Sequence, residues 1–311
     1  MEQFAWKKGE KPDDELERMT QEYNASEALS HRRSESRYGH FDHELPRTEK
    51  QREVVSLAVS VFAEHFRRLE VPLDREFGFE FEQFHFFDRN GFDEEFPDMQ
   101  GALGNHGRHG VIALVERKSR GEFFHTLLHE MTHAVAVKKY ELDSEEKFPT
   151  YRNGYMIANR GASDSDIDGE SFHFKAFNEG VVEMTALRMM SRYADQFRNF
   201  NISEKEIEDT LQNFSYEGIV AVINEIISGL AVVLGEDDLE IWKRIERGQY
   251  TGEMMWMRGI DLVFGKGSLR VLDSLIAWPK TDTERDHNKK VLEYFQMKNA
   301  DERIAFQSEI Y

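Results

Sequence analysis

The chain has 311 residues, with 40 Lys and Arg against 59 Asp and Glu, a formal net charge of -19 and no Cys. A field of this sign repels phosphate backbones and anionic lipids, so the composition argues against nucleic acid and membranes as partners. The lack of Cys excludes disulfides and Cys-ligated metal sites. No apolar run approaches the roughly 20 residues that span a bilayer, and the first residues lack a secretory signal, so we expect a cytoplasmic protein.

The first predicted elements are a polar arm and a helix. Residues 1–47 are polar and charged with little periodicity, which predicts a loosely packed or partly disordered arm. Thr48 and Gln51 then have the form of a capping box. Apolar residues recur at helical spacing after them, which predicts a helix over residues 48–70.

A strand, a loop and a second strand are expected next. Phe77, Phe79 and Phe81 alternate with polar residues, as in a half-buried strand. Residues 101–110 are rich in Gly, Asn and His, which predicts a loop. Residues 111–116, with the sequence VIALVE, are β-prone and predict a short strand.

The rest of the chain is expected to be mostly helical. Residues 122–140 form a helical segment whose apolar side chains cover most of its circumference, so this helix should be buried. A long polar connection follows over residues 141–171, and then a second helix over residues 174–193. Ser203 and Glu206 form another capping box, which starts a largely helical C-terminal part.

These elements predict an α+β fold. We expect a first domain over residues 48–200 with a small sheet, followed by an all-helical subdomain over residues 201–311. Helix stops inside this subdomain are expected at Gly235, Gly248, Gly265 and Pro279.

The first of the two helices carries the pattern H-E-x-x-H, from His129 through Glu130 to His133. Residues four apart lie on one helical face, so the two imidazoles can bind one Zn²⁺. Glu130 then lies beside the metal and can take a proton from a zinc-bound water. The alternative is two ordinary histidines flanking a surface glutamate. It fits poorly, because the helix is apolar nearly all round and buried polar groups need partners.

A third ligand is expected from the second helix. A third histidine six residues after His133 is excluded, since Ala136 and Lys139 stand where that type of site needs Gly and His. Glu179 and Glu183 lie four residues apart on one helical face, so one can bind zinc while the other hydrogen-bonds a zinc-binding histidine. A solvated acidic face is the alternative, and the apolar neighbours of the two glutamates weigh against it.

HEMTHA followed by NEGVVE resembles the gluzincin group of zinc metallopeptidases. The resemblance implies a zincin-like domain with one zinc ion per chain, bound by His129, His133 and Glu179. It implies Glu130 as the general base and Glu183 as the acid that holds a ligating histidine. The implied activity is hydrolysis of peptide bonds in a peptide or protein substrate. The two motifs cover a small part of the chain, and their separation is longer than in the thermolysin-like members.

Three further features of gluzincins are expected here, from sequence signals that are less specific than the two motifs. Residues 111–116 are the candidate for the strand that pairs with extended substrate, although an internal strand is equally compatible with them. The connection over residues 141–173 is expected to form a lid or one wall of a cleft between the two parts. His125, one turn before His129, is expected to pack beside the site rather than to bind metal.

A hydrogen-bond donor to the oxyanion is also expected, usually from a His or a Tyr. We favour Tyr151, Tyr155 and His173, and Tyr216 and Tyr250 could also serve. No spacing rule selects among these residues.

Two alternatives stay open. Glu130 and His133 also fit the E-x-x-H pattern of di-iron carboxylate bundles, which requires a second such pair. Two pairs have this spacing: Glu82 with His85, and Glu170 with His173. The first lies in a strand pattern and the second follows a loop, so neither fits a bundle helix. The other alternative is a zincin-fold binding or regulatory protein without turnover. No pattern predicts cleavage specificity or oligomeric state.

Overall fold

The computed structural model describes residues 3–5, 41–71, 79–106, 111–117, 119–141, 150–159 and 171–310. This part of the chain is mainly helical with two small sheets, which confirms the predicted α+β class. The finer expectation of a zincin-like fold stays a prediction. Of the predicted polar arm, only Gln3–Ala5 and residues 41–47 fall within the described ranges.

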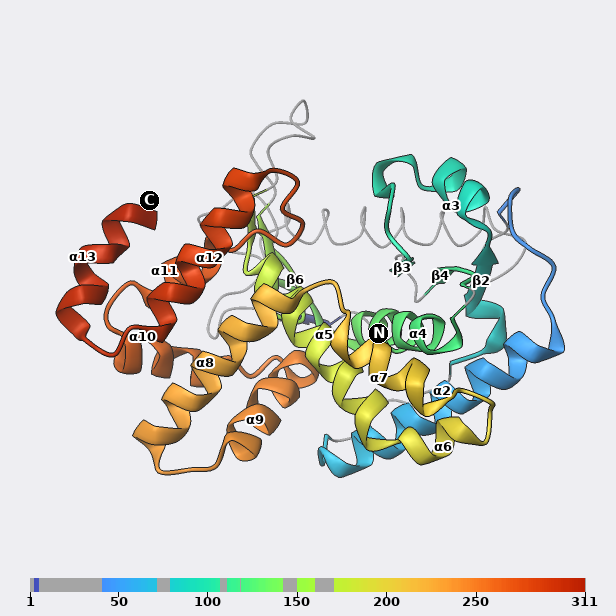
Figure 1. Cartoon of the computed structure of the whole chain (residues 1–311), viewed down its shortest axis with the longest axis horizontal. Helices are drawn as coiled ribbons and strands as arrows, with labels where there is room; N and C mark the ends of the chain where they lie inside the picture. Colours follow the sequence, from blue (N-terminus) through green and yellow to red (C-terminus); the bar gives the residue numbers. More distant parts are fainter. Residues whose placement is uncertain are drawn as a thin grey trace.

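Helices α4 (Arg120–Val135) and α5 (Lys175–Arg192) lie near the middle of the molecule, and α2 (Glu49–Arg68) runs below them in the view of Figure 1. The predicted capping box starts α2, with the Thr48 and Gln51 side chains each accepting the other residue's backbone N–H. α4 and α5 pack directly against each other, and α2 packs against both. The two segments that carry the motifs are therefore neighbours in space.

The smaller sheet packs beside α4 and contains β2 (Phe84–Phe87), β4 (Ile112–Val115) and β3 (Gly104–His106), with β4 in the middle. β2 runs parallel to β4, and β3 runs antiparallel to it. Since β4 is hydrogen-bonded on both sides, residues 111–116 are an internal strand and not the strand that could pair with substrate. Within the described residues β2 and β3 are the two edge strands of this sheet, and β3 lies where a loop was predicted.

The prediction of a strand from the alternation of Phe77, Phe79 and Phe81 is wrong for the described residues 79–81. Phe81 opens a 3₁₀ turn, and the strand follows at β2, whose four residues are all buried. A strand that is covered on both faces shows no apolar–polar alternation, so the sequence FHFF gave no such signal. Phe77 lies outside the described residues.

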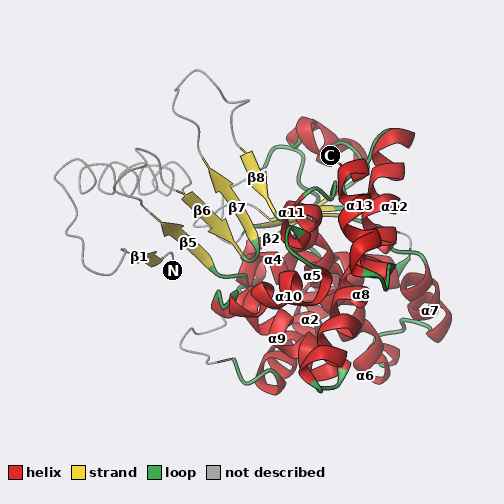
Figure 2. Cartoon of the chain, turned by 90° about the vertical axis from the view of Figure 1, so that its left-hand side faces the viewer, coloured by secondary structure: helices red, strands yellow, loops and turns green. Residues whose placement is uncertain are grey.

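The larger sheet lies at one side of the helical body (Figure 2). Its strands, in spatial order, are β1 (Gln3–Ala5), β5 (Lys138–Glu141), β6 (Thr150–Asn153), β7 (Met156–Asn159) and β8 (Ser171–His173). Neighbouring strands run antiparallel, except that β1 is parallel to β5.

This sheet corrects two expectations. The helix predicted over residues 122–140 ends at Val135, because Ala136 adopts an extended ψ of 148° and the chain enters β5. The connection predicted as a polar loop over residues 141–171 contains β6 and β7. Strands with sequences such as KKYE and TYRN have no apolar period, so hydrophobic patterning does not reveal them. The remainder of that connection lies mostly outside the described residues.

The described part of the chain beyond residue 193 is helical, as predicted. The capping box of Ser203 and Glu206 starts α7, and Gly235 and Gly265 follow directly on α8 and α10. Gly248 is not a stop but lies inside α9, where a Cβ would collide with the Tyr155 hydroxyl. The helices not yet placed are α3 (Arg89–Glu95), α6 (Ala194–Arg198), α7 (Glu204–Gln212), α8 (Glu217–Leu234), α9 (Asp238–Thr251), α10 (Arg258–Phe264), α11 (Ser268–Asp273), α12 (Asp282–Gln296) and α13 (Ala300–Ile310).

Two large hydrophobic cores share helix α5. Its Met189 and Met190 belong to the core around α2, α4 and the smaller sheet, whereas its Phe177 and Val181 belong to the core of the C-terminal helices. Ile207 of α7 belongs to the first of these cores. The division of the chain near residue 200 into two units stays a prediction.

Helix α8 is the one described helix that is long and apolar enough to cross a membrane by length and composition. Its 18 residues come close to the roughly 20 apolar residues that span a bilayer, a length that we did not expect from the sequence. Its buried residues, among them Val222, Ile226 and Leu230, pack in the C-terminal core, whereas Val232, Val233 and Leu234 at its end are exposed. The cytoplasmic location stays a prediction.

Candidate metal centre

Helix α4 presents His129 and His133 toward α5, while much of its remaining circumference packs in the core around α2, α4 and the smaller sheet. Phe124, Leu127 and Leu128 are buried there. The helix begins at Ser119, whose side chain accepts the backbone N–H of Glu122. His129 and His133 lie one turn apart and are both buried.

Helix α5 brings Glu179 close to the two histidines because α5 packs directly on α4, and it also packs tightly on α8. At Gly180 a Cβ would lie only 2.5 Å from Cγ2 of Ile219, so a larger residue would push the two helices apart. The Gly in NEGVVE therefore has a packing role. Glu179 and Glu183 are both buried on the face toward α4.

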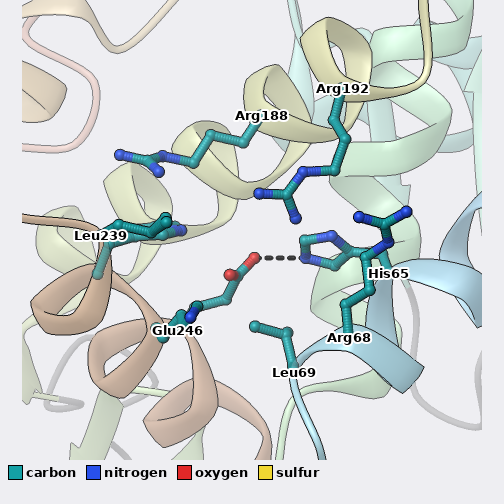
Figure 3. Close-up of a pocket in the computed structure, with 9 residues that line it drawn as sticks. His65, Arg68, Leu69, Arg188, Arg192, Leu239 and Glu246 are labelled. Carbon is teal, nitrogen blue, oxygen red and sulfur yellow. Dashed lines mark hydrogen bonds and ion pairs between the residues drawn. The ribbon is translucent and has the colours of Figure 1, made fainter.

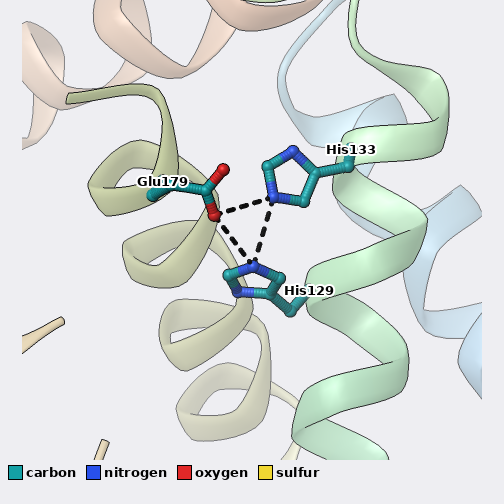
Figure 4. A group of neighbouring side chains, drawn as sticks. All are labelled: His129, His133 and Glu179. Carbon is teal, nitrogen blue, oxygen red and sulfur yellow. Dashed lines mark hydrogen bonds and ion pairs between the residues drawn. The ribbon is translucent and has the colours of Figure 1, made fainter. Parts of the chain in front are cut away.

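Three side-chain atoms converge between the two helices (Figure 4). Nε2 of His133 lies 3.2 Å from Nε2 of His129 and 3.2 Å from Oε2 of Glu179, and the third separation, from His129 Nε2 to Glu179 Oε2, is 3.6 Å. Three ligands of a tetrahedral zinc ion, each about 2.0–2.1 Å from the metal, would lie about 3.3–3.4 Å apart. The group could therefore hold one metal ion, as predicted.

Burial and the nearby carboxylates shift the pKa values of the two histidines in opposite directions. Burial alone would lower the pKa of His129, but the carboxylates of Glu179 and Glu183 outweigh it and raise that pKa well above its usual value. For His133 burial dominates, and its pKa is lowered. Burial would raise the pKa of Glu179, but both histidines outweigh it and hold that pKa well below its usual range. A negative carboxylate facing two imidazole nitrogens is a favourable donor set for a divalent cation.

Glu183 fixes the orientation of His129. Its Oε2 lies 2.8 Å from His129 Nδ1. When a neutral His129 ring donates Nδ1–H to Glu183, its Nε2 is left to bind an ion. Its Oε1 lies 3.4 Å from Nε2 of His125. His125 thus packs against Glu183 and is not part of the converging group.

Glu130 lies beside the group, next to the edge strand β3. Its Oε2 is 3.7 Å from Nδ1 of His106, whose ring is stacked on that of His133 at a centroid distance of 4.7 Å and an angle of 7°. At Gly104 a Cβ would lie 2.7 Å from Cγ of Glu130, so the strand can approach Glu130 this closely only with glycine. Burial raises the pKa of Glu130.

Gly104 and His106 were missed from the sequence. They lie in the segment that we interpreted as a loop, and a strand of three residues is too short for a period to be recognised. The available signal was a Gly and a His two residues apart, on one face of any strand, shortly before the β-prone run.

Among the five candidate oxyanion donors, the structure brings Tyr216 to the group. Its ring is parallel to that of His129 at 10°, with a centroid distance of 5.8 Å. Its hydroxyl oxygen accepts a hydrogen bond from Nε1 of Trp278 at 2.7 Å. Burial and the carboxylates of Glu179, Glu183 and Glu130 raise the pKa of Tyr216, so its hydroxyl keeps its proton.

The other four candidates are not brought to the group by any described contact. The buried Tyr155 hydroxyl donates to Ile245 O at 2.7 Å and accepts from Trp256 Nε1 at 2.9 Å, so its hydrogen bonds are made within the C-terminal core. Nδ1 of His173 lies 2.7 Å from Oδ2 of Asp273. Tyr250 packs in the first core. The side chain of Tyr151 lies outside what the structure describes.

No second E-x-x-H pair joins Glu130 and His133 among the described residues. His85 lies on β2 and its Nδ1 is 2.9 Å from Oε2 of Glu44, while Glu82 lies in the 3₁₀ turn before β2. Glu170 is outside the described ranges. The described part of the chain shows one group of three possible metal ligands, which does not favour a di-iron centre.

No protein-family model matches this chain, and neither the curated proteins nor the solved structures contain a significant match to it.

Proposed function

We propose that the chain is a zinc-dependent peptide hydrolase. The observation that carries this proposal is the convergence of His129, His133 and Glu179 at separations of 3.2 to 3.6 Å, with Glu130 beside them. Two imidazoles and one carboxylate are the ligand set of several zinc peptidases. A zinc ion held there would polarise the scissile carbonyl and lower the pKa of a coordinated water toward ~7.

Glu130 is placed to move the proton. Burial raises its pKa, so the carboxylate can accept a proton near neutral pH and later return it to the leaving amine. Glu183 keeps its charge, because His125 and His129 outweigh burial and lower its pKa. It therefore continues to hold the His129 ring in one tautomer.

The edge strand β3 supports a peptide as the substrate. An extended peptide can add to a free sheet edge through main-chain hydrogen bonds. Among the described residues β3 has no second neighbour, and it packs against α4 at the level of Glu130. A peptide bond that lies along β3 would therefore lie close to the metal centre.

The close approach of β3 to Glu130 leads to a prediction for Gly104→Ala. The added methyl group would displace the Glu130 carboxylate, and a displacement of about 1 Å can cost about 10²-fold in rate. We expect kcat/KM to fall about 10- to 100-fold while zinc content and secondary structure are unchanged. The control is Gly218→Ala, a helical position where a Cβ meets nothing within 4 Å. Unchanged kcat/KM for Gly104→Ala would contradict this placement of Glu130.

Tyr216 and His106 flank the centre from two sides, and a second prediction separates their roles. Tyr216→Phe keeps the ring against His129 and removes only the hydroxyl. If this hydroxyl stabilises the oxyanion, kcat should fall about 10²- to 10³-fold with little change in KM. Steady-state kinetics on one defined peptide measures both constants. An unchanged kcat for Tyr216→Phe, with a large loss for His106→Phe, would assign the donor role to His106 instead.

The proposal as a whole is tested with a degenerate peptide library. Zinc-loaded protein is expected to cleave a subset of peptides, chelation should stop cleavage, and added zinc should restore it. Mass spectrometry of the products identifies the cleaved bonds. A zinc-loaded, folded protein that cleaves no member of the library would count against a peptide hydrolase.

A further inference from the structure

A cavity of about 300 Å³ lies between α2, α5 and α9, away from the metal centre (Figure 3). Arg192, which lines it, follows Glu179 by 13 residues on α5, which corresponds to about 20 Å along the helix. None of the proposed metal ligands lines this cavity. The cavity is therefore a separate site.

Four cationic side chains surround the cavity in a protein whose net charge is -19. Arg68 pairs with Glu64 at 3.0 Å, and Lys243 pairs with Glu240. Among the described residues the other two have no ion-pair partner: the Arg188 guanidinium lies 4.8 Å from the centroid of the Trp242 ring, and no ion pair is formed by Arg192.

The two arginines of α5 repel each other. Burial is the largest influence on the pKa of Arg188 and lowers it; the attraction of Glu246 and Asp238 opposes this effect, and the charge of Arg192 adds to it. In Figure 3 the Arg192 side chain extends toward the His65 ring. A bound anion would relieve the repulsion between the two guanidinium groups.

The floor of the cavity holds an unused polar atom. His65 and Glu246 are each 2% exposed, and His65 Nε2 lies 2.6 Å from Glu246 Oε1. Nδ1 of His65 is buried with no hydrogen-bond partner among the described residues. Such an atom is costly unless a ligand or water meets it. In the tautomer whose Nε2–H donates to Glu246, Nδ1 is an acceptor for a ligand hydroxyl or a water.

We propose that this cavity binds a small organic anion through a phosphate or carboxylate group. Arg188 and Arg192 hold the anionic group, because guanidinium groups bind such oxygens through paired hydrogen bonds. Leu69, Leu239 and Trp242 provide an apolar wall for the rest of the ligand. Glu246 repels the anion, but its charge faces His65, so the anionic group lies toward the arginines. The volume, at the lower end of ligand sites, limits the ligand to a small molecule.

The test is a titration of the zinc-loaded full chain with inorganic phosphate and, separately, with succinate, at about 0.15 M salt. We expect saturable one-to-one binding in calorimetry and a rise in Tm with ligand concentration. Arg192→Gln should weaken binding about tenfold or more. Arg285→Gln, which removes the same charge from an exposed ion pair on α12, should leave it unchanged.

Histidine NMR gives a second readout, since the ring signals of His65 should shift on titration while those of His287 on α12 do not. Phosphate binding alone or succinate binding alone would support the site and identify the anionic group. The proposal is overturned if neither anion binds saturably, or if Arg192→Gln and Arg285→Gln bind as the unchanged protein does. Neither readout depends on hydrolysis, so failure here would leave the proposed activity untouched.

Discussion

Glu130→Gln is expected to lower kcat/KM about 10²- to 10⁴-fold while one zinc ion per chain stays bound. The amide has nearly the shape of the carboxylate but cannot accept a proton. Because Glu130 is not one of the three converging ligands, the donor set of His129, His133 and Glu179 is unchanged. The measurements are kcat/KM on a peptide found in the library screen and zinc stoichiometry on the same sample.

The matched control for this variant is Glu208→Gln, an exposed position on α7. It makes the same chemical change far from the centre and should retain full activity. If Glu130→Gln and Glu208→Gln were both as active as the unchanged protein, Glu130 would not be the base. If zinc binds but neither the unchanged protein nor any variant cleaves peptides, the chain is better described as a metal-containing binding or regulatory protein.

The second large effect is expected for Glu179→Ala, which removes the only carboxylate from the converging group. Two imidazoles at 3.2 Å remain, and they hold a zinc ion much less tightly than three ligands do. Zinc affinity, measured by competition with a chromophoric chelator, should fall by more than 100-fold, beyond the loss that supporting residues usually cause. Hydrolysis should disappear with the metal.

Glu183→Ala is the control that distinguishes loss of a metal ligand from loss of a residue that supports a ligand. Loss of Glu183 leaves the three ligands in place but removes the partner of His129 Nδ1, so affinity should fall only about 10- to 100-fold. A larger loss for Glu183→Ala than for Glu179→Ala would exchange the two assigned roles. Circular dichroism of both variants checks that α4 and α5 remain folded.

The parts of the centre that lie on helices could be predicted from the sequence. The spacing of His129, His133, Glu179 and Glu183 is a property of local helical geometry, and the apolar residues around them indicate burial. The pairing of α4 with α5 was inferred only from the chemistry that the two motifs would share. The structure places these residues together, without any similar protein to guide the interpretation.

The parts that depend on short strands or distant contacts could not be predicted. Gly104 and His106 reach Glu130 through a three-residue edge strand that has no recognisable period. Tyr216 meets His129 only because α8 packs on α5, a contact that local sequence does not encode. Tyr155 was favoured instead, yet its hydroxyl is engaged by Ile245 and Trp256 in the C-terminal core.

Helix α5 forms part of both hydrophobic cores while it carries Glu179 and Glu183. A change of packing in either core therefore shifts α5 in the other core as well. The distances among the three possible ligand atoms thus depend on the packing of both cores. A substitution that creates a cavity at the buried Ile223, which lies against Gly180, is therefore expected to lower the affinity of the centre for a metal ion. A metal ion bound by all three side chains would in turn join α4 to α5, so metal loading is expected to raise the Tm as well as to complete the proposed centre.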